Sequence, residues 1–252
     1  MNYTYSCTPK ELLQKSRIPI RVLESEQEIY EEMSALMIET IRQKKGEQVV
    51  FICPVGPIAH YPLFVKKVNE QNLNLRNVWF FNMDEYLLKN DQMIPTDNSL
   101  SFRGFMERTV YSRIKPELIM PEEQRLFPLP GKEREIDALL AQLNYADCCL
   151  TGVGINGHLA FNEPPGINDD VGDAEYRNSA TRCLDLSGET IVNNGSRKIK
   201  GALDLMPTRC ITLGMKQKIA LEEATRFAPA SFLQLHPNSE MVITKELLNT
   251  KF

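Results

Sequence analysis

The chain has 252 residues, of which 42% are hydrophobic and 25% are charged, with 13 glycines and 15 prolines. These values exclude a disordered, collagen-like or coiled-coil chain. A net charge of −4 without a long basic stretch argues against a protein that binds nucleic acid through the phosphate backbone.

Targeting signals are absent from the sequence pattern. No apolar run approaches the about 20 residues of a membrane-spanning helix, and residues 1–10 lack the apolar core of a signal peptide. Six cysteines occur without a CxxC spacing, and we interpret Cys53, Cys148 and Cys149 as small buried hydrophobic residues within apolar runs. We therefore expect a protein of the reducing cytoplasm, with neither a membrane nor a nucleic-acid partner.

The predicted elements alternate between short apolar strands and amphipathic helices. In chain order, they are a helix over 26–45, a strand over 48–53, a helix over 62–70, a strand over 78–82, helices over 99–114 and 132–143, a strand over 146–152, a strand over 208–213, a helix over 216–227 and a strand over 240–244. This order is typical of an α/β fold: a three-layer, Rossmann-like and mostly parallel sheet with helices on both faces. We expect a single domain over residues 1–252.

Ligands of such sheets bind beyond the carboxyl ends of the strands. Three segments are expected there: the loop after Cys53, the segment after Asn82 and the segment after Gly152.

The segment after Asn82 carries two adjacent carboxylates, Asp84 and Glu85. Burial or a neighbouring charge raises the pKa of a carboxyl, so one of the two is a candidate general base. The alternative is an acidic turn that caps the next element.

The segment from Gly152 to Pro165 contains Gly152, Gly154 and Gly157 and one of only three histidines, His158. Such a turn can present N–H groups to an anion, and Glu163 could orient the imidazole as a general acid–base unit. Pro164 and Pro165 exclude the long helix that a dinucleotide-binding glycine motif requires. A purely structural turn is the alternative.

Basic residues gather late in the chain, at Arg197, Lys198, Lys200, Arg209, Lys216 and Lys218. A local basic cluster in an acidic protein favours a small anionic ligand, whereas a solvated face is the plainer interpretation.

Three blocks together are similar to one enzyme family. The runs Phe81–Tyr86, Gly152–Pro164 and Leu233–Pro237 resemble the glucosamine-6-phosphate deaminase/isomerase family in order and approximate spacing, and the similarity spans about residues 26–244. The family converts an amino-sugar 6-phosphate to a ketose 6-phosphate and ammonia, without a metal or organic cofactor. The resemblance also implies a homo-oligomer.

The resemblance implies a role for each matching residue. Asp84 would be the base at C2 of the sugar, His158 the acid–base of ring opening, and Glu163 its orienting partner, with Asn156 beside them. The residues implied to bind substrate or phosphate are Gly56, Glu85, Gly154, Gly157, Arg197 and Lys218, with Lys216 as a rival for Lys218.

Asn156 is the first departure from the family. Glucosamine enzymes carry Asp there, and Asn cannot exchange a proton although it can hydrogen-bond and orient. Enzymes of the galactosamine 6-phosphate branch resemble this chain at Asn156 and at Pro229–Leu233. The two positions together favour a galactosamine-type substrate.

The phosphate loop is the second departure. The family's Thr-Gly-(Gly/Ser)-Thr-Pro is replaced by Val55–Ala59, which lacks two hydroxyls, and Pro57 also lacks an N–H. A phosphate nest of the family type cannot form here in the same way. His60, Tyr61 and the basic residues are the candidates to compensate.

The third departure is a shorter chain after Thr212–Met215, where a helix and strand of about 15–20 residues are expected from typical element lengths. These differences leave two alternatives to a deaminase: a sugar-phosphate-binding protein without catalysis, and a hydrolase related to 6-phosphogluconolactonase. The run Asn162–Pro164 matches the deaminases and argues against the lactonase.

Overall fold

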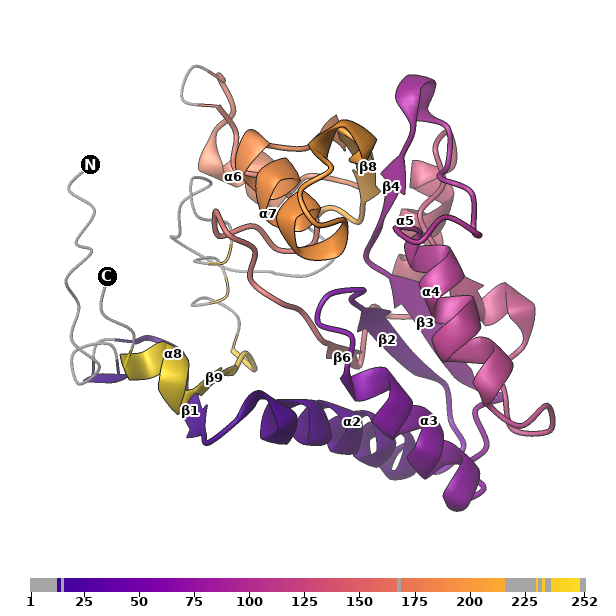
Figure 1. Ribbon diagram of the computed structural model, residues 1–252. Helices are drawn as coiled ribbons and strands as arrows, with labels where there is room; N and C mark the ends of the chain where they lie inside the picture. The colour runs from indigo at the N-terminus through magenta and orange to yellow at the C-terminus, as the bar shows by residue number, and fades with distance from the viewer. Residues whose placement is uncertain are drawn as a thin grey trace.

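The computed structural model describes residues 13–14, 16–166, 169–215, 230, 233 and 237–249. Its central sheet consists of four parallel strands in the order β5-β3-β2-β6 (Figure 1). Their bounds are Val49–Cys53 for β2, Val78–Asn82 for β3, Arg125–Leu126 for β5 and Cys148–Cys149 for β6.

Helices cover both faces of this sheet. Helices α2 (Glu26–Gln43), α3 (His60–Glu70) and α4 (Phe102–Thr109) contribute to the same apolar cluster as Phe51 of β2. Helix α5 (Glu133–Gln142) packs instead with the neighbouring Ile52. Successive side chains of a strand point to opposite faces, so the helices lie on opposite sides. The predicted three-layer α/β architecture is confirmed.

Helix α2 illustrates how local sequence sets an element. The Ser25 side chain accepts a hydrogen bond from the Glu28 N–H at 3.3 Å and caps the first turn. The helix ends at Gln43, two residues earlier than predicted, and Lys45 and Gly46 then adopt positive φ angles of 50° and 91°. Only the glycine enters this region without a steric penalty.

A second sheet stands beyond the carboxyl ends of the central strands. It is antiparallel, in the order β4-β8-β7, with β4 at Asp84–Leu87, β7 at Arg182–Asp185 and β8 at Arg209–Thr212. The strand predicted near 208–213 is therefore present, but it pairs outside the parallel sheet. Met83 links the sheets, since its N–H donates to the Cys53 carbonyl at 2.9 Å and its carbonyl accepts from the Leu213 N–H at 2.7 Å.

Helix α7 (Gly188–Lys198) connects β7 to β8, and the Ser187 side chain caps it by accepting from the Thr190 N–H at 3.2 Å. The remaining described helices are short: α6 at Asp173–Arg177, α8 at Lys245–Asn249, and four 3₁₀ turns at Lys89–Asp91, Tyr111–Arg113, Glu122–Gln124 and Leu203–Leu205.

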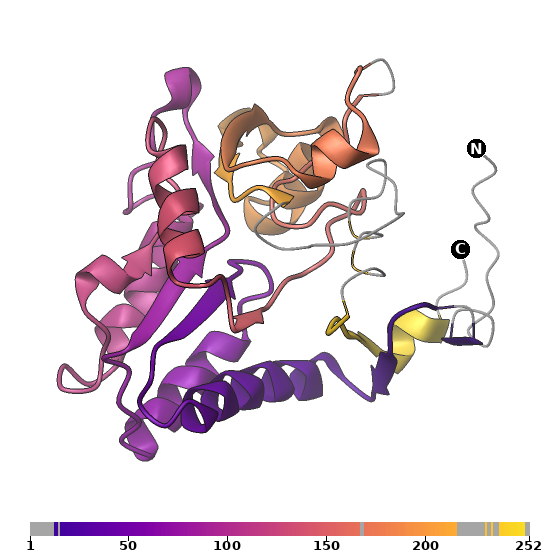
Figure 2. The same cartoon turned by 180° about the vertical axis from the view of Figure 1, so that it is seen from behind.

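Strands β1 (Ile20–Leu23) and β9 (Met241–Thr244) form a separate parallel pair beside the N-terminal end of α2 (Figures 1 and 2). Arg21 ties the pair to α2, because its guanidinium contacts Glu240 and lies 2.6 Å from a Glu32 carboxylate oxygen. The predicted strand near 240–244 is thus present, although it is not part of the central sheet.

The predicted helix over 216–227, with Lys216 and Lys218, and the motif residue His236 lie outside the described residues. No helix of the described part is long and apolar enough to cross a membrane. Cys53 is buried as predicted. The expectation is wrong for Cys149, which is exposed on β6, an edge strand of the four-stranded sheet.

Candidate active site

The three segments singled out by position do meet beyond the carboxyl ends of the central strands. The loop after β2 touches the segment after β6, since a Cβ on Gly152 would lie 3.0 Å from the Gly56 carbonyl oxygen. The Asn162 amide donates to the Leu213 carbonyl at 2.9 Å, and the Leu213 N–H reaches Met83 after β3. One small region therefore holds all three.

His158 lies at the centre of this region with its side chain 12% exposed. Its Nδ1 is 3.3 Å from Glu163 Oε2 and 3.3 Å from Thr190 Oγ1. A carboxylate facing Nδ1 favours the proton on that nitrogen and leaves Nε2 as the reactive atom. Gly154 is sterically required, because a Cβ there would lie 1.9 Å from His158 Nε2.

The Glu163 carboxyl is held in its ionised form. Its burial would raise the pKa, but hydrogen bonds from His158, Asn156 and Thr190 outweigh that effect and lower the pKa to about 2. The pair is thus an imidazole oriented by an ionised carboxylate, as a general acid–base unit requires.

Asn156 orients the pair without touching the imidazole ring. Its side-chain N–H groups donate to Glu163 Oε2 at 2.6 Å and to Ser187 Oγ at 3.0 Å, and its Oδ1 accepts from the His158 backbone N–H at 3.2 Å. An amide supplies both donors and acceptor at once, whereas an ionised Asp here would repel Glu163.

A buried network fixes the backbone around Glu163. The Tyr176 hydroxyl donates to the Asn162 carbonyl at 2.7 Å and to the Glu163 carbonyl at 3.0 Å. Arg182 donates to the Asn162 side-chain oxygen at 2.9 Å. These contacts pin the segment to α6 and β7.

The glycine turn does not present the expected N–H groups to an anion. The Gly154 N–H donates to the His158 carbonyl at 2.9 Å, and the Gly157 N–H donates to the Gly154 carbonyl at 3.0 Å. Both donors are therefore used within the turn. Gly157 has a φ of 80°, a conformation that favours glycine. Gly154 and Gly157 therefore shape the backbone around the His158 imidazole and do not form an anion-binding nest.

Asp84 begins β4 and is 5% exposed, paired in register with Thr212 of β8. Thr212 in turn accepts a hydrogen bond from the Phe161 N–H at 3.3 Å, in the same segment as His158. The second sheet thus joins Asp84 to the histidine segment.

Glu85 has a different role from the one implied by the family. It is fully buried and accepts from the N–H groups of Tyr86, Phe102 and Arg103 at 2.8–2.9 Å and from the Ser101 hydroxyl at 3.0 Å. Burial raises the pKa of the Glu85 carboxyl even though these donors favour the charged form. Its oxygens face the N-terminus of α4, so Glu85 caps a helix and we do not retain it as a substrate ligand.

The last turn of α7 carries two further cations of the region, Arg197 and Lys198, both exposed residues. From the sequence, Arg197 is a predicted phosphate ligand, whereas Lys198 is predicted only as part of the basic cluster. Ser187 and Thr190 are not among the predicted residues, although Ser is a preferred N-cap residue.

The loop after β2 leads into α3 at Ala59, which provides no side-chain cap for that helix. Few N–H groups of this first turn are open to an anion, since the Tyr61 N–H donates to the Ile58 carbonyl at 3.2 Å and Pro62 has no N–H. Gly56 is exposed, and a Cβ on it would meet no atom within 4 Å, so no close contact requires glycine there. His60 is fully buried, and burial lowers its pKa to about 4, so its imidazole is uncharged at neutral pH.

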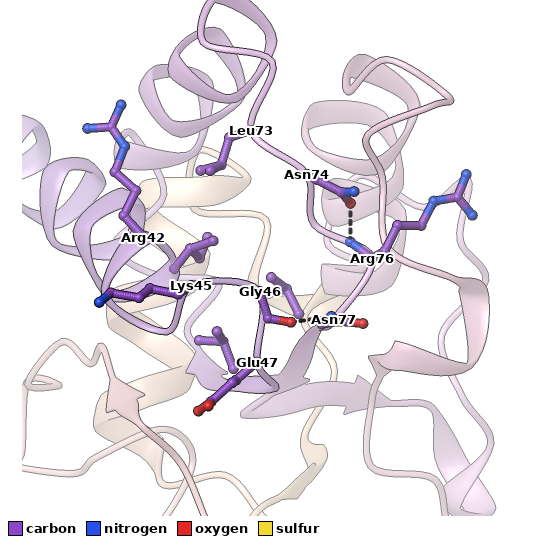
Figure 3. A pocket seen from close by; sticks show the side chains of 11 residues that line it. Arg42, Lys45, Gly46, Glu47, Leu73, Asn74, Arg76 and Asn77 are labelled. Atoms are coloured by element: carbon purple, nitrogen blue, oxygen red, sulfur yellow. Dashed lines mark hydrogen bonds between the residues drawn. The ribbon is translucent and has the colours of Figure 1, made fainter.

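A pocket of about 320 Å³ lies at the opposite end of the central sheet, where β2 and β3 begin (Figure 3). Arg42, Lys45 and Arg76 line it, but their charged ends point in different directions. It contains none of the candidate catalytic residues. Among the described residues, no group of three His, Cys, Asp or Glu side chains is arranged to hold a metal ion.

Similar sequences are curated glucosamine-6-phosphate deaminases. The chain is 26% identical to the enzyme of Rhodopirellula baltica over 253 residues, covering 90% of this chain and 93% of that protein. It is 27% identical to the enzyme of Shouchella clausii over 248 residues, covering 86% of this chain and 92% of that protein. No protein-family model matches the chain.

Solved structures share the fold. A monomeric glucosamine-6-phosphate deaminase, described as the missing link of the NagB superfamily, superposes with a TM-score of 0.75 at 20% identity, covering 91% of this chain and 98% of that one. The 6-phosphogluconolactonase of Thermotoga maritima superposes with a TM-score of 0.54 at 19% identity, covering 90% of this chain and 98% of that one. In sequence, the chain is similar to glucosamine-6-phosphate deaminases over about nine-tenths of its length, and it has the fold of a solved enzyme of that name.

Proposed function

We propose that the protein converts an amino-sugar 6-phosphate and water to a ketose 6-phosphate and ammonia. The observation that carries the proposal is the His158–Glu163 pair, with Nδ1 and Oε2 3.3 Å apart, in a chain similar over nine-tenths of its length to glucosamine-6-phosphate deaminases. The buried Asp84 on the adjoining sheet supplies the second group that aldose–ketose isomerisation needs.

Ring opening falls to His158. Nε2 shuttles the proton between the anomeric hydroxyl and the ring oxygen, and Glu163 stabilises the imidazolium that forms on the way. Proton transfer by a positioned side chain typically accounts for about 10²–10⁴ in rate.

Enolisation falls to Asp84. Its carboxylate takes the proton from C2, the C2–H electron pair forms the C1–C2 double bond, and the carbonyl electrons move to the C1 oxygen. Reprotonation at C1 gives an imine at C2, to which water adds before ammonia leaves. The carbon skeleton and its phosphate stay intact.

Phosphate binding is proposed for Arg197, for Lys218 and for the loop at Gly56. Support comes from the exposed Arg197 at the end of α7 and from the close approach of the Gly56 loop to Gly152, which places that loop at the candidate site.

The test is ammonia release by the purified protein, with glucosamine 6-phosphate and galactosamine 6-phosphate assayed side by side. We expect turnover of at least one sugar. Asp84→Asn should abolish turnover but keep ligand affinity, and His158→Gln should slow the closed-ring sugar far more than its open-chain form. No ammonia from either sugar, together with hydrolysis of 6-phosphogluconolactone, would replace the proposal by a lactonase. Tight sugar-phosphate binding without turnover would replace it by a binding protein.

The sugar epimer is part of the same proposal. The curated relatives named above are glucosamine enzymes, whereas Asn156 favours galactosamine 6-phosphate. We propose the galactosamine sugar as the preferred substrate, and the ratio of kcat/KM for the two sugars decides it.

A homo-oligomer in the cytoplasm remains a prediction from the sequence. The structural neighbour with a TM-score of 0.75 is a monomeric enzyme. Sedimentation of the purified protein distinguishes a monomer from an oligomer.

A further inference from the structure

Lys198 is a cation that the proposed reaction has not yet used. It ends α7, and its Nζ lies 4.5 Å from the ring centre of Phe102 and 5.4 Å from that of Tyr86. One turn earlier, Asn194 donates to the Tyr86 hydroxyl at 3.0 Å and holds the helix against β4. Part of the residue is exposed, whereas its ammonium lies over the buried Tyr86 and Phe102 rings.

The aromatic rings beneath Lys198 connect it to the candidate acid–base pair. The ring centre of Phe161 is 5.0 Å from that of Tyr86 and 5.7 Å from that of Phe102. The same Phe161 ring lies 6.4 Å from the His158 imidazole. The ammonium and the imidazole therefore border one buried aromatic cluster, which fixes their positions relative to each other.

The charge of Asp84 acts on the Lys198 ammonium. Surrounding protein reduces the hydration of the ammonium and lowers its pKa to about 8, against the opposing effect of Asp84 and Glu85, and Arg197 adds to the lowering. The attraction places a positive charge near the carboxylate that is the proposed base at C2. Glu85 is already held by four donors, three of them at the start of α4, so Asp84 is the carboxylate left to interact with Lys198.

We propose that Lys198 is a catalytic residue whose ammonium donates a hydrogen bond to the C1 oxygen of the open-chain sugar. This inference rests on the proposed function and adds a residue to it. During enolisation, a negative charge moves from the Asp84 carboxylate to the C1 oxygen, as the C2 proton goes to Asp84. A cation beside both positions stabilises the charge where it arrives, and removing one such donor costs about 10²–10³ in kcat.

The test compares Lys198→Met with Lys200→Met, which removes an exposed lysine two residues further on. The Met side chain matches Lys in length and packs well on aromatic rings, so the fold should persist. We expect Lys198→Met to lose about 10²–10³ in kcat with KM within threefold. Lys200→Met should match the wild type, and Lys198→Arg should recover part of the loss.

Measuring the binding of two inhibitors tests the Lys198 contact independently of turnover. Two probes are used: a phosphorylated hydroxamate, which carries the negative charge of the enolate, and the corresponding amino-alditol 6-phosphate, which does not. Lys198→Met should weaken only the hydroxamate, by about the factor lost from kcat. Equal losses for both probes, or none, would overturn the assignment even if the wild type releases ammonia. Selective loss of the hydroxamate in a protein without ammonia release would overturn the reaction instead and leave the contact standing.

Discussion

At the scale of single residues, Glu163 decides the charge of the candidate site. Its folded pKa of about 2 lies below the ordinary value of 4.5, so its contribution to stability is present above the ordinary value and is lost as the pH falls toward 2. At 1.36 kcal/mol per pKa unit, the contribution is roughly 3 kcal/mol.

We expect Glu163→Gln to remove this part of the acid dependence. The difference in unfolding free energy between the wild type and the variant, measured by urea denaturation, should shrink by about 3 kcal/mol from pH 6 to pH 2. Glu117→Gln, at an exposed carboxylate, is the control and should show no such change. A difference that stays constant with pH would refute the lowered pKa of Glu163.

Asn156 is the residue at which an amide and a carboxylate differ most. Its Nδ2 lies 2.6 Å from Glu163 Oε2, and two carboxylates this close together cannot both be ionised. In Asn156→Asp we expect one of the pair to carry a proton at neutral pH, with a raised pKa. The protonated carboxyl contributes stability that is lost as the pH rises through its raised pKa. The unfolding free energy of the variant should therefore fall by about 1–3 kcal/mol more between pH 5 and pH 8 than that of the wild type. Urea denaturation at the two pH values checks this, and a loss independent of pH would contradict it.

At the scale of elements, the helix-capping position of Glu85 could not be predicted from the sequence. Two adjacent carboxylates at a strand end look equivalent in sequence, but successive strand residues point in opposite directions. Only the fold reveals that the N-terminus of α4 lies where the Glu85 carboxylate points, since Phe102 is 17 positions further along the chain.

We expect Glu85→Ala to destabilise the protein by about 2–4 kcal/mol, because buried N–H groups of α4 lose their acceptor. KM for the sugar phosphate should be unchanged in protein that remains folded. The measurement pairs a urea midpoint with steady-state kinetics at low temperature. Wild-type stability with a raised KM would return Glu85 to substrate binding.

Prediction of elements from the sequence depended on how fully each is buried. Strand β2 has five buried residues, and its apolar run is evident. Strand β7 and helix α7 are polar on their exposed sides, and α7 contains Gly195 and two asparagines, which are weak helix formers. Ser187 is the strong local signal for the start of α7. The position of the Lys198 ammonium depends on the packing of α7 against Tyr86, which the local sequence does not reveal.

At the scale of the whole molecule, the sequence order of the motifs predicted which segments would meet, because parallel strands bring their carboxyl ends to one edge. It did not predict that the strands would divide among three sheets. That division depends on pairings between distant segments, such as Ile20 with Met241 and Asp84 with Thr212, for which local patterns contain no information.

The division into sheets implies unequal stability. A two-stranded sheet is marginal on its own in water, and β1–β9 has four register pairs and exposed ion pairs at Arg21, which contribute little. Strands β2 and β3 lie in the main apolar cluster instead. We therefore expect amide hydrogens of β1 and β9 to exchange through local opening at rates at least about 10² faster than those of β2 and β3, a difference of about 2.7 kcal/mol in opening free energy. Native-state hydrogen exchange with mass spectrometry measures both, and Arg21→Ala should speed β1 and β9 further while leaving β2 unchanged. Equal protection in the two sheets would mean that the β1–β9 pair opens only when the central sheet unfolds.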